Sequence, residues 1–239
     1  MKAIIKAELY RFFSTKNCLL GLSLSVSLPI AIYLYLIMNH QLSTTIDKSA
    51  IILISLNFVS VGIIFFSAYF FGEEYQQNLL RTTLLSVPNR VKVLLAKLLS
   101  LNALVLVSFF LIAITLISLN LFFRNGTTPI MLEILWKRLL LILISEELLV
   151  LITCGICILF KSTYLAVALL ACLQIGGSQM LFAFTDYAKY LPDLAVINLY
   201  TWTPQQAFLS IGTGMVVQGI WATLVFLLSL LLFFKRDVR

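Results

Sequence analysis

Two adjacent carboxylates lie inside an otherwise apolar stretch of the chain. Glu146 and Glu147 interrupt the run Leu139 to Phe160, about 12 Å along a helix from the end that we expect to face outward. A carboxylate that faces lipid at this depth costs on the order of several kcal/mol. At least one of the two must therefore face protein or water. Adjacent side chains of a helix point about 100° apart, so the pair cannot hold one ligand in a simple way.

Two interpretations of this pair remain open. In the first, Glu146 or Glu147 lies on a substrate pathway and contacts a cationic substrate or a basic group of a partner subunit. In the second, the pair has a structural partner such as Lys137 or Arg138, or the membrane span begins later than drawn. We favour the second, because intramembrane carboxylates usually find a partner.

A Glu-Glu pair in a membrane helix also resembles the intramembrane proteases of the prenyl-processing family. Those proteins share a Glu-Glu-x-x-x-Arg step and histidines on other helices. Here Leu151 occupies the arginine position, and His40 is the only histidine in the sequence. Too many of the required roles lack a residue, so we expect neither catalytic nor metal-binding residues.

The composition places the chain in a membrane. Of its 239 residues, 61% are hydrophobic and 11% are charged, whereas an ordinary soluble domain has about 25% charged residues. Continuous apolar runs of roughly 20 residues favour helices over a membrane barrel, whose segments alternate. We therefore predict one all-α, polytopic domain over residues 1–239. Its six spans are Cys18 to Met38, Ile51 to Phe71, Leu98 to Phe123, Leu139 to Phe160, Thr163 to Phe184 and Thr213 to Phe234.

The basic residues predict the orientation. Twelve of the Lys and Arg side chains fall in the N-terminal segment, the loops after the second and fourth spans and the C-terminal tail, and five fall in the alternate segments. The positive-inside rule then places both termini in the cytoplasm of a multi-pass protein, and we expect a bacterial plasma membrane. The net charge of +7 is not gathered in a stripe, so we expect no nucleic-acid partner.

Motifs for cofactors are absent from the sequence. No G-x-x-x-x-G-K-[ST] loop occurs, so we expect any ATP and its Mg to bind a separate subunit. Cys154 and Cys157 have a C-x-x-C spacing, but they are surrounded by Leu, Ile and Gly. We interpret all four cysteines as small apolar side chains in or at the ends of spans.

Residues 1–17 precede the first span and are predicted to form a helix on the inner membrane surface. Ile5, Leu9, Phe12 and Phe13 recur at i, i+4, i+7 and i+8, which is typical of an interfacial amphipathic helix. A generic basic flank that fixes topology is an equally good interpretation of the same residues.

The segment 72–97 is the most informative one outside the spans. Glu73 and Glu74 stand at the start of a helical pattern, where acidic groups complement the helix dipole. An apolar stripe and a turn then follow, formed by Leu80, Thr83, Leu84 and Val87 and by Pro88, Asn89 and Arg90. The pattern predicts a short amphipathic helix, a sharp turn and a return to the membrane. Such an element can press its apolar face and flanking charges into a groove of another protein.

This segment resembles the loop between the first two core helices of permease subunits in the type-2 ABC exporter family. The residues that carry the likeness are Glu74, Leu80, Arg81, Leu85, Pro88, Arg90 and Lys97, together with Glu8-Leu9-Tyr10-Arg11 and Tyr190-Leu191-Pro192. Asn78-Leu79 stands where Gly-Thr is usual in that family, although Asn tolerates the left-handed conformation. The resemblance implies a cytoplasmic coupling helix, with Glu73, Glu74, Leu80, Arg81, Leu84, Pro88 and Arg90 docking on the ATPase.

The segment 185–212 lies before the last span and should face outward. It is half apolar and rich in Tyr and Trp, residues that prefer the interface between lipid and water. The resemblance implies short re-entrant helices here, over a dimer interface. A plain loop with aromatic anchors is the alternative.

These features predict the non-catalytic membrane subunit of an ATP-driven exporter. Within that family the chain looks closest to subunits that export, or confer immunity to, antimicrobial and amphipathic peptides, including lantibiotics. The expected partners are two ATPase subunits, a second identical or homologous permease chain, lipid, and a peptide or other lipophilic substrate. The alternatives are an exporter of another lipophilic substrate or drug, a membrane scaffold or sensor, and a proton-driven transporter using Glu146 or Glu147, although the sequence shows no inverted repeat.

Overall fold

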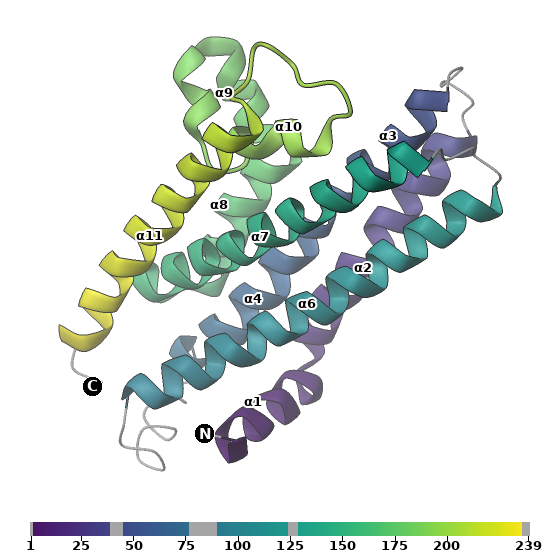
Figure 1. Ribbon diagram of the computed structural model, residues 1–239. Coiled ribbons are helices and arrows are strands. Elements are labelled where there is room, and N and C mark those ends of the chain that lie inside the picture. Colours follow the sequence, from purple (N-terminus) through teal and green to yellow (C-terminus); the bar gives the residue numbers. More distant parts are fainter. Residues whose placement is uncertain (1, 39–44, 77–89, 124–128, 236–239) are drawn as a thin grey trace.

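The fold is a bundle of helices. A computed structural model describes residues 2–38, 45–76, 90–123 and 129–235, and these residues form helices and turns but no strand (Figure 1). The elements are α1 Lys2–Ser14, α2 Lys16–Met38, α3 Thr45–Leu56, α4 Val59–Gln76, α6 Arg90–Phe122, α7 Pro129–Phe160, α8 Thr163–Cys172, the π-turn η1 Leu173–Gly177, α9 Ser178–Phe184, the 3₁₀ turns η2 Asp186–Tyr190 and η3 Leu194–Val196, α10 Ile197–Tyr200 and α11 Ile211–Lys235.

Six segments of this bundle are long and apolar enough to cross a bilayer, as the sequence predicts. They are Lys16–Met38, Ala50–Glu73, Val91–Phe122, Glu133–Phe160, Thr163–Phe184 and Ile211–Phe233. α6 and α7, with 33 and 32 residues, are about 50 Å long, well beyond the ~30 Å of the hydrocarbon core. The third and fourth spans predicted from the sequence are therefore shorter than α6 and α7.

Two of the six spans are broken helices. The second span is divided by a turn at Asn57 and Phe58, between α3 and α4. The fifth is divided by η1, where Gly176 has a φ of 137°, a conformation that residues with a side chain rarely adopt. The two breaks lie together, because Gln174 Nε2 donates to the backbone carbonyl of Asn57 at 3.3 Å and to its side-chain oxygen at 3.2 Å.

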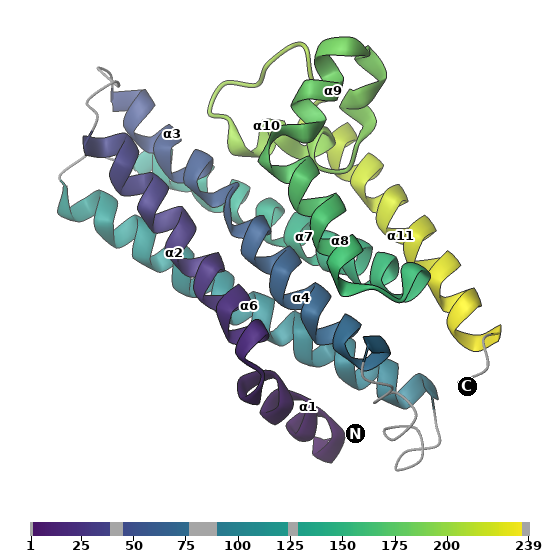
Figure 2. The ribbon, with the colours of Figure 1, turned by 180° about the vertical axis from the view of Figure 1, so that it is seen from behind.

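Two spans form the centre of the bundle. In the most apolar 18-residue stretches of Ala50–Glu73 and Glu133–Phe160, 67% and 61% of the residues are buried. The corresponding share is 22% or less in α2, the fifth span and α11. α4 packs mainly against α2, α7 and α8, and α7 packs mainly against α11 and α4 (Figures 1 and 2). The outer helices expose apolar side chains, as expected where lipid is the solvent.

The ends of the helices alternate as an even number of spans requires. α1, the end of α4, the start of α6 and the end of α11 lie at one end of the bundle, together with both termini (Figures 1 and 2). The start of α3, the end of α6, the start of α7 and the segment from η2 to α10 lie at the opposite end. The described parts of the basic N-terminal segment, of the loop after the second span and of the C-terminal tail thus lie at the end with the termini. That this end is cytoplasmic stays a prediction.

α1 covers most of the N-terminal segment and packs against α6. Phe12 is fully buried, with its ring centroid 5.7 Å from that of Phe66 and 5.6 Å from that of Phe70. Glu8 is also buried, at 5% exposure. A position of α1 at the membrane surface stays a prediction.

One local prediction is wrong. Glu73 and Glu74 do not begin a helix, because α4 continues through both residues to Gln76. The apolar run stops at Phe71, but a helix does not have to end where its apolar stretch ends. Both residues therefore belong to the last turn of a central helix.

Small residues allow α2 and α4 to approach closely. A β-carbon at Gly21 would lie 2.6 Å from the backbone nitrogen of Phe66, and a β-carbon at Gly62 would collide with the backbone of Ser25. Such contacts between small residues are a main source of helix association in lipid, where no hydrophobic force acts between helices.

We predict that Gly62→Ala lowers the free energy of unfolding by about 1–3 kcal/mol, because the new methyl group separates α2 from α4. Gly219→Ala on α11 is the matched control, since no atom lies within 4 Å of its β-carbon position. Both variants can be compared by unfolding in mixed micelles with increasing dodecyl sulfate, followed by circular dichroism. Equal stabilities of the two variants would contradict the close packing.

Candidate functional site

A layer of polar side chains crosses the bundle near the middle of α7. Glu146 and Glu147 follow Pro129, the first residue of α7, by about 26 Å of helix, and the whole helix is about 48 Å long. Polar residues from α6, α10 and α11 meet this part of α7. We call Asn102, Ser145, Glu146, Glu147, Tyr200 and Gln218 the polar layer.

Glu146 points into the bundle. Its side chain is 1% exposed, and its Oε1 accepts a hydrogen bond of 3.1 Å from the hydroxyl of Tyr200 in α10. Burial and the neighbouring Glu146 raise the pKa of Tyr200 well above its ordinary value, so the phenol stays neutral and remains a donor. In the described part of the chain the second oxygen of Glu146 has no hydrogen-bond partner.

Ser145 faces α11. Its hydroxyl donates to Gln218 Oε1 at 2.9 Å, and Gln218 Nε2 donates back to the carbonyl of Ser145 at 3.2 Å. Both side chains are 2% exposed. This reciprocal pair satisfies each group inside the bundle and fixes α11 against α7 at the depth of the two carboxylates.

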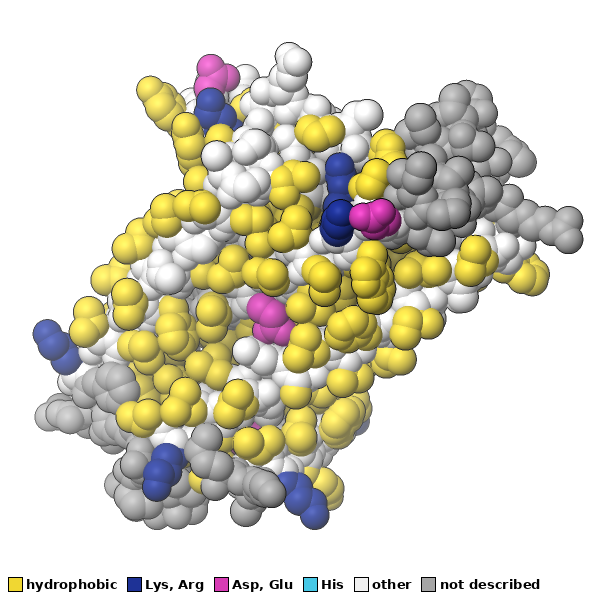
Figure 3. Space-filling view, in the orientation of Figure 1, with side chains coloured by type: hydrophobic (Ala, Val, Ile, Leu, Met, Phe, Trp, Pro, Cys, Tyr) yellow, Lys and Arg dark blue, Asp and Glu magenta, His cyan; other side chains and the backbone are white. Residues whose placement is uncertain are grey.

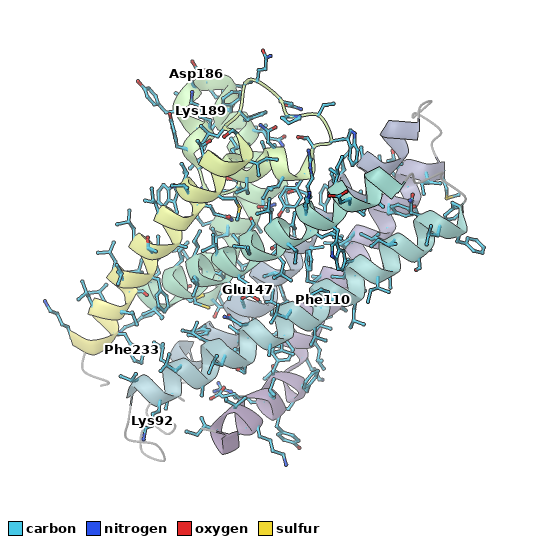
Figure 4. All side chains as sticks on the ribbon, in the orientation of Figure 1. Lys92, Phe110, Glu147, Asp186, Lys189 and Phe233 are labelled. Carbon is cyan, nitrogen blue, oxygen red and sulfur yellow. The ribbon has the colours of Figure 1, made fainter. Side chains whose placement is uncertain are left out.

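Glu147 points to a different side of α7, towards α6. In the amide orientation that satisfies both groups, the side-chain nitrogen of Asn102 donates to Glu147 Oε2 at 3.1 Å and to the carbonyl of Leu98 at 3.1 Å. Glu147 is only partly buried, and its Oε1 has no hydrogen-bond partner among the described residues. Figure 3 shows acidic atoms in the centre of an apolar face, at the place where Figure 4 labels Glu147.

The two carboxylates thus have separate environments, as the angle between adjacent helix positions predicts. The structure gives Lys137 and Arg138 other partners. Lys137 Nζ lies 2.8 Å from Glu133 Oε1 in an exposed ion pair. Arg138 donates to the backbone carbonyls of Thr201 and Trp202, the latter at 3.0 Å. The structural alternative that paired either base with Glu146 or Glu147 is therefore wrong. A later start of the membrane span along α7 stays a prediction.

Arg138 instead holds the outer segment on the bundle. Its guanidinium lies 5.8 Å from the ring centroid of Trp202, in addition to its two carbonyl acceptors. Tyr200 makes the second attachment through Glu146. The turn from α10 towards α11 is thus tied to α7 at two depths.

The outer segment has its own buried polar centre. Asn198 is 1% exposed; its Nδ2 donates to the carbonyls of Gln205 and Leu209 at 3.1 and 2.9 Å, and its Oδ1 accepts from the backbone nitrogen of Gln205 at 2.9 Å. Asp193 accepts a hydrogen bond from Ser178 Oγ, and burial raises the pKa of Asp193 above its ordinary value. The segment contains the short elements η2, η3 and α10, and the re-entrant helices stay a prediction.

Most of the predicted docking residues lie outside the part of the chain that the structure describes. These are Leu80, Arg81, Leu84 and Pro88. Glu74 and Arg90 are placed by their backbones alone, in the last turn of α4 and at the first position of α6. Glu73, in the same turn of α4, is partly buried.

The remaining candidate groups are structural. Cys18, Cys154 and Cys157 are buried free thiols, in agreement with their interpretation as apolar side chains, while the free thiol of Cys172 is exposed. Among the described residues, no group of three His, Cys, Asp or Glu side chains could hold a metal ion. Asn102, Tyr200 and Gln218 are not predicted as site residues from the sequence, although a single polar residue in an apolar run was the available signal for Asn102 and Gln218.

Comparisons with known proteins assign no family to this arrangement. No protein-family model, no curated protein and no solved structure matches the chain.

We predict that Tyr200→Phe lowers the free energy of unfolding by about 1–3 kcal/mol, because it leaves the buried carboxyl group of Glu146 without its donor. Tyr187→Phe is the control, since Tyr187 is 83% exposed and its change should stay within about 0.5 kcal/mol. Dodecyl sulfate unfolding in mixed micelles measures both. A Tyr200→Phe variant as stable as the control would show that the hydrogen bond contributes nothing.

Proposed function

We propose that the chain is the membrane-spanning subunit of an ATP-driven exporter of the type-2 ABC class. In this proposal two permease chains form the pathway, two cytoplasmic ATPase subunits bind at the end of the bundle where the termini lie, and amphipathic or antimicrobial peptides are moved out of the cell or membrane. The motif resemblance of residues 72–97 and the bundle of six apolar spans support it.

The observation that carries the proposal is how firmly both ends of residues 72–97 are joined to the centre of the bundle. At the first end, Gly72 in α4 packs so closely on Thr163 at the start of α8 that a β-carbon would collide with the Thr163 hydroxyl. At the second end, Lys97 in α6 is 2% exposed, and its Nζ lies 4.9 and 5.1 Å from the ring centroids of Phe70 and Phe71. A force applied between these two ends therefore acts directly on α4, a central helix.

The same packing suggests the path of a conformational change. α4 packs on α7, and α7 carries the polar layer in its middle and the two attachments of the outer segment. ATP binding would bring the ATPases together and move α4 and α6, and α7 would pass this movement to the outer segment. Opening towards the outside or the lateral lipid would follow from displacement of the outer segment.

The breaks in the second and fifth spans fit this mechanism. Each divides a span into an outer part, α3 or α9, and an inner part, α4 or α8. A broken helix can bend at its break while its inner half stays packed, which a continuous helix of the same length resists. Discontinuous spans of this kind are common in transport proteins.

We predict that charge reversal in residues 72–97 weakens ATPase binding. Arg81→Glu and Glu74→Lys should each reduce the ATPase that co-purifies with the chain, by about tenfold or more where the charge is buried in the docked interface. The ATPase is identified by mass spectrometry of the complex purified from the native host, and its amount is compared between variants.

Lys189→Glu is the matched control for this experiment. It reverses a charge in η2, at the opposite end of the bundle, and should leave ATPase binding unchanged. Undiminished binding in both Arg81→Glu and Glu74→Lys would remove the docking role. A purified complex with another cytoplasmic partner and no ATPase would favour a membrane scaffold.

A further inference from the structure

A shallow groove runs along the seam between α6 and α7. Its walls are apolar and include three aromatic side chains, and it is lined by Phe109, Phe110, Ala113, Trp136, Leu139, Leu140 and Leu143. Phe110 and Trp136 are 44% and 57% exposed, so the groove opens on the outer surface of the bundle. Its walls suit an apolar chain or ring.

Glu147 lies just beyond the inner end of this groove, outside the residues that line it. It follows Leu143 by one helical turn on the same face of α7, about 6 Å along the axis. On α6, Asn102 precedes Phe109 by two turns on the same face and donates to Glu147. Figure 4 labels Glu147 and Phe110, both in the middle part of the bundle. The apolar groove is thus followed, one helical turn further along α7, by a partly buried carboxylate.

The described chain offers no base to this carboxylate. On α7, Lys137 and Arg138 lie more than two turns away and contact Glu133 and the outer segment. On α6, Lys97 lies over the rings of Phe70 and Phe71, on the side of α4. Among the bases that the structure describes, none is thus bound to Glu147, which leaves this carboxylate open to a positive group of another molecule.

We infer that the α6–α7 groove binds a cationic amphiphile, with the apolar body against Phe109, Phe110 and Leu143 and the ammonium or guanidinium group on Glu147. Asn102 donates to one oxygen of the carboxylate, and acidic atoms are visible on the apolar face at the place of Glu147 (Figures 3 and 4). A positive group at this site offsets the cost of a carboxylate inside the membrane. Glu146 takes no part, because it points into the bundle and binds Tyr200.

This site deepens the proposed function by naming its substrate class, and the role of the ligand as a transported substrate rests on that proposal. The binding of the ligand to the groove does not depend on that proposal. The groove belongs to one chain, so its occupancy can be measured on the purified protein without an ATPase. A failure of ATPase docking and a failure of this site are thus separate results.

The test compares a charged and an uncharged probe of the same length. Dodecylammonium and dodecanol are titrated into the purified chain in lipid nanodiscs, and binding is followed by calorimetry after subtraction of partition into empty nanodiscs. The wild type should bind dodecylammonium more tightly than dodecanol. Glu147→Gln should lose about tenfold or more of the affinity for dodecylammonium and keep that for dodecanol. Glu133→Gln, which removes an exposed carboxylate of the same helix, should change neither.

Equal affinity of the wild type for both probes, or unchanged dodecylammonium binding by Glu147→Gln, would overturn the inference.

A second measurement needs no variant. A hydrophobic carbodiimide, which modifies carboxyl groups in apolar surroundings, should label Glu147 as detected by peptide mass spectrometry, and dodecylammonium should slow this labelling while dodecanol does not. If dodecylammonium and dodecanol slow the labelling equally, the inference is also overturned. Binding of any lipid-like chain in the groove would then explain the protection of Glu147.

Discussion

Water is absent from the middle of a bilayer, so every polar group there must find its partner inside the protein. In this chain α7 is the helix on which such groups meet. Ser145 and Gln218 satisfy one another across α7 and α11, and Tyr200 reaches Glu146 from the outer segment. Each of these bonds fixes a neighbouring element at a defined depth along α7. The order of the helices around α7 follows from this requirement as much as from apolar packing.

The second central helix, α4, is held in another way. Its neighbours approach it through small residues, with Gly62 against Ser25 and Gly72 against Thr163. Contacts of this kind depend on shape, and they leave little room for a rotation of one helix against the other. The bundle therefore combines a close-packed central helix with one that carries a polar layer. The apolar groove beside α6 borders on α7, the helix that carries the polar layer.

The spans and their alternation could be predicted from the sequence. Long apolar runs indicate segments that contact lipid, and the distribution of Lys and Arg indicates which connecting segments share one side of the membrane. The partners of the carboxylates could not. Tyr200 is 54 residues from Glu146, and which of several outer tyrosines reaches it depends on how η3 and α10 pack. Arg138 was a reasonable partner by distance along the helix, but the free carbonyls at the turn after α10 compete for it. The break at Asn57 was not foreseen either, since one polar residue in an apolar run does not by itself end a helix.

The two broken spans share one further property. Gln174, in the π-turn of the fifth span, is hydrogen-bonded to Asn57, the residue at which the second span turns. One side chain thus links the two places where the helical hydrogen-bond pattern of these spans is interrupted. A bend at either break would therefore have to break these two hydrogen bonds or be followed by a bend at the other.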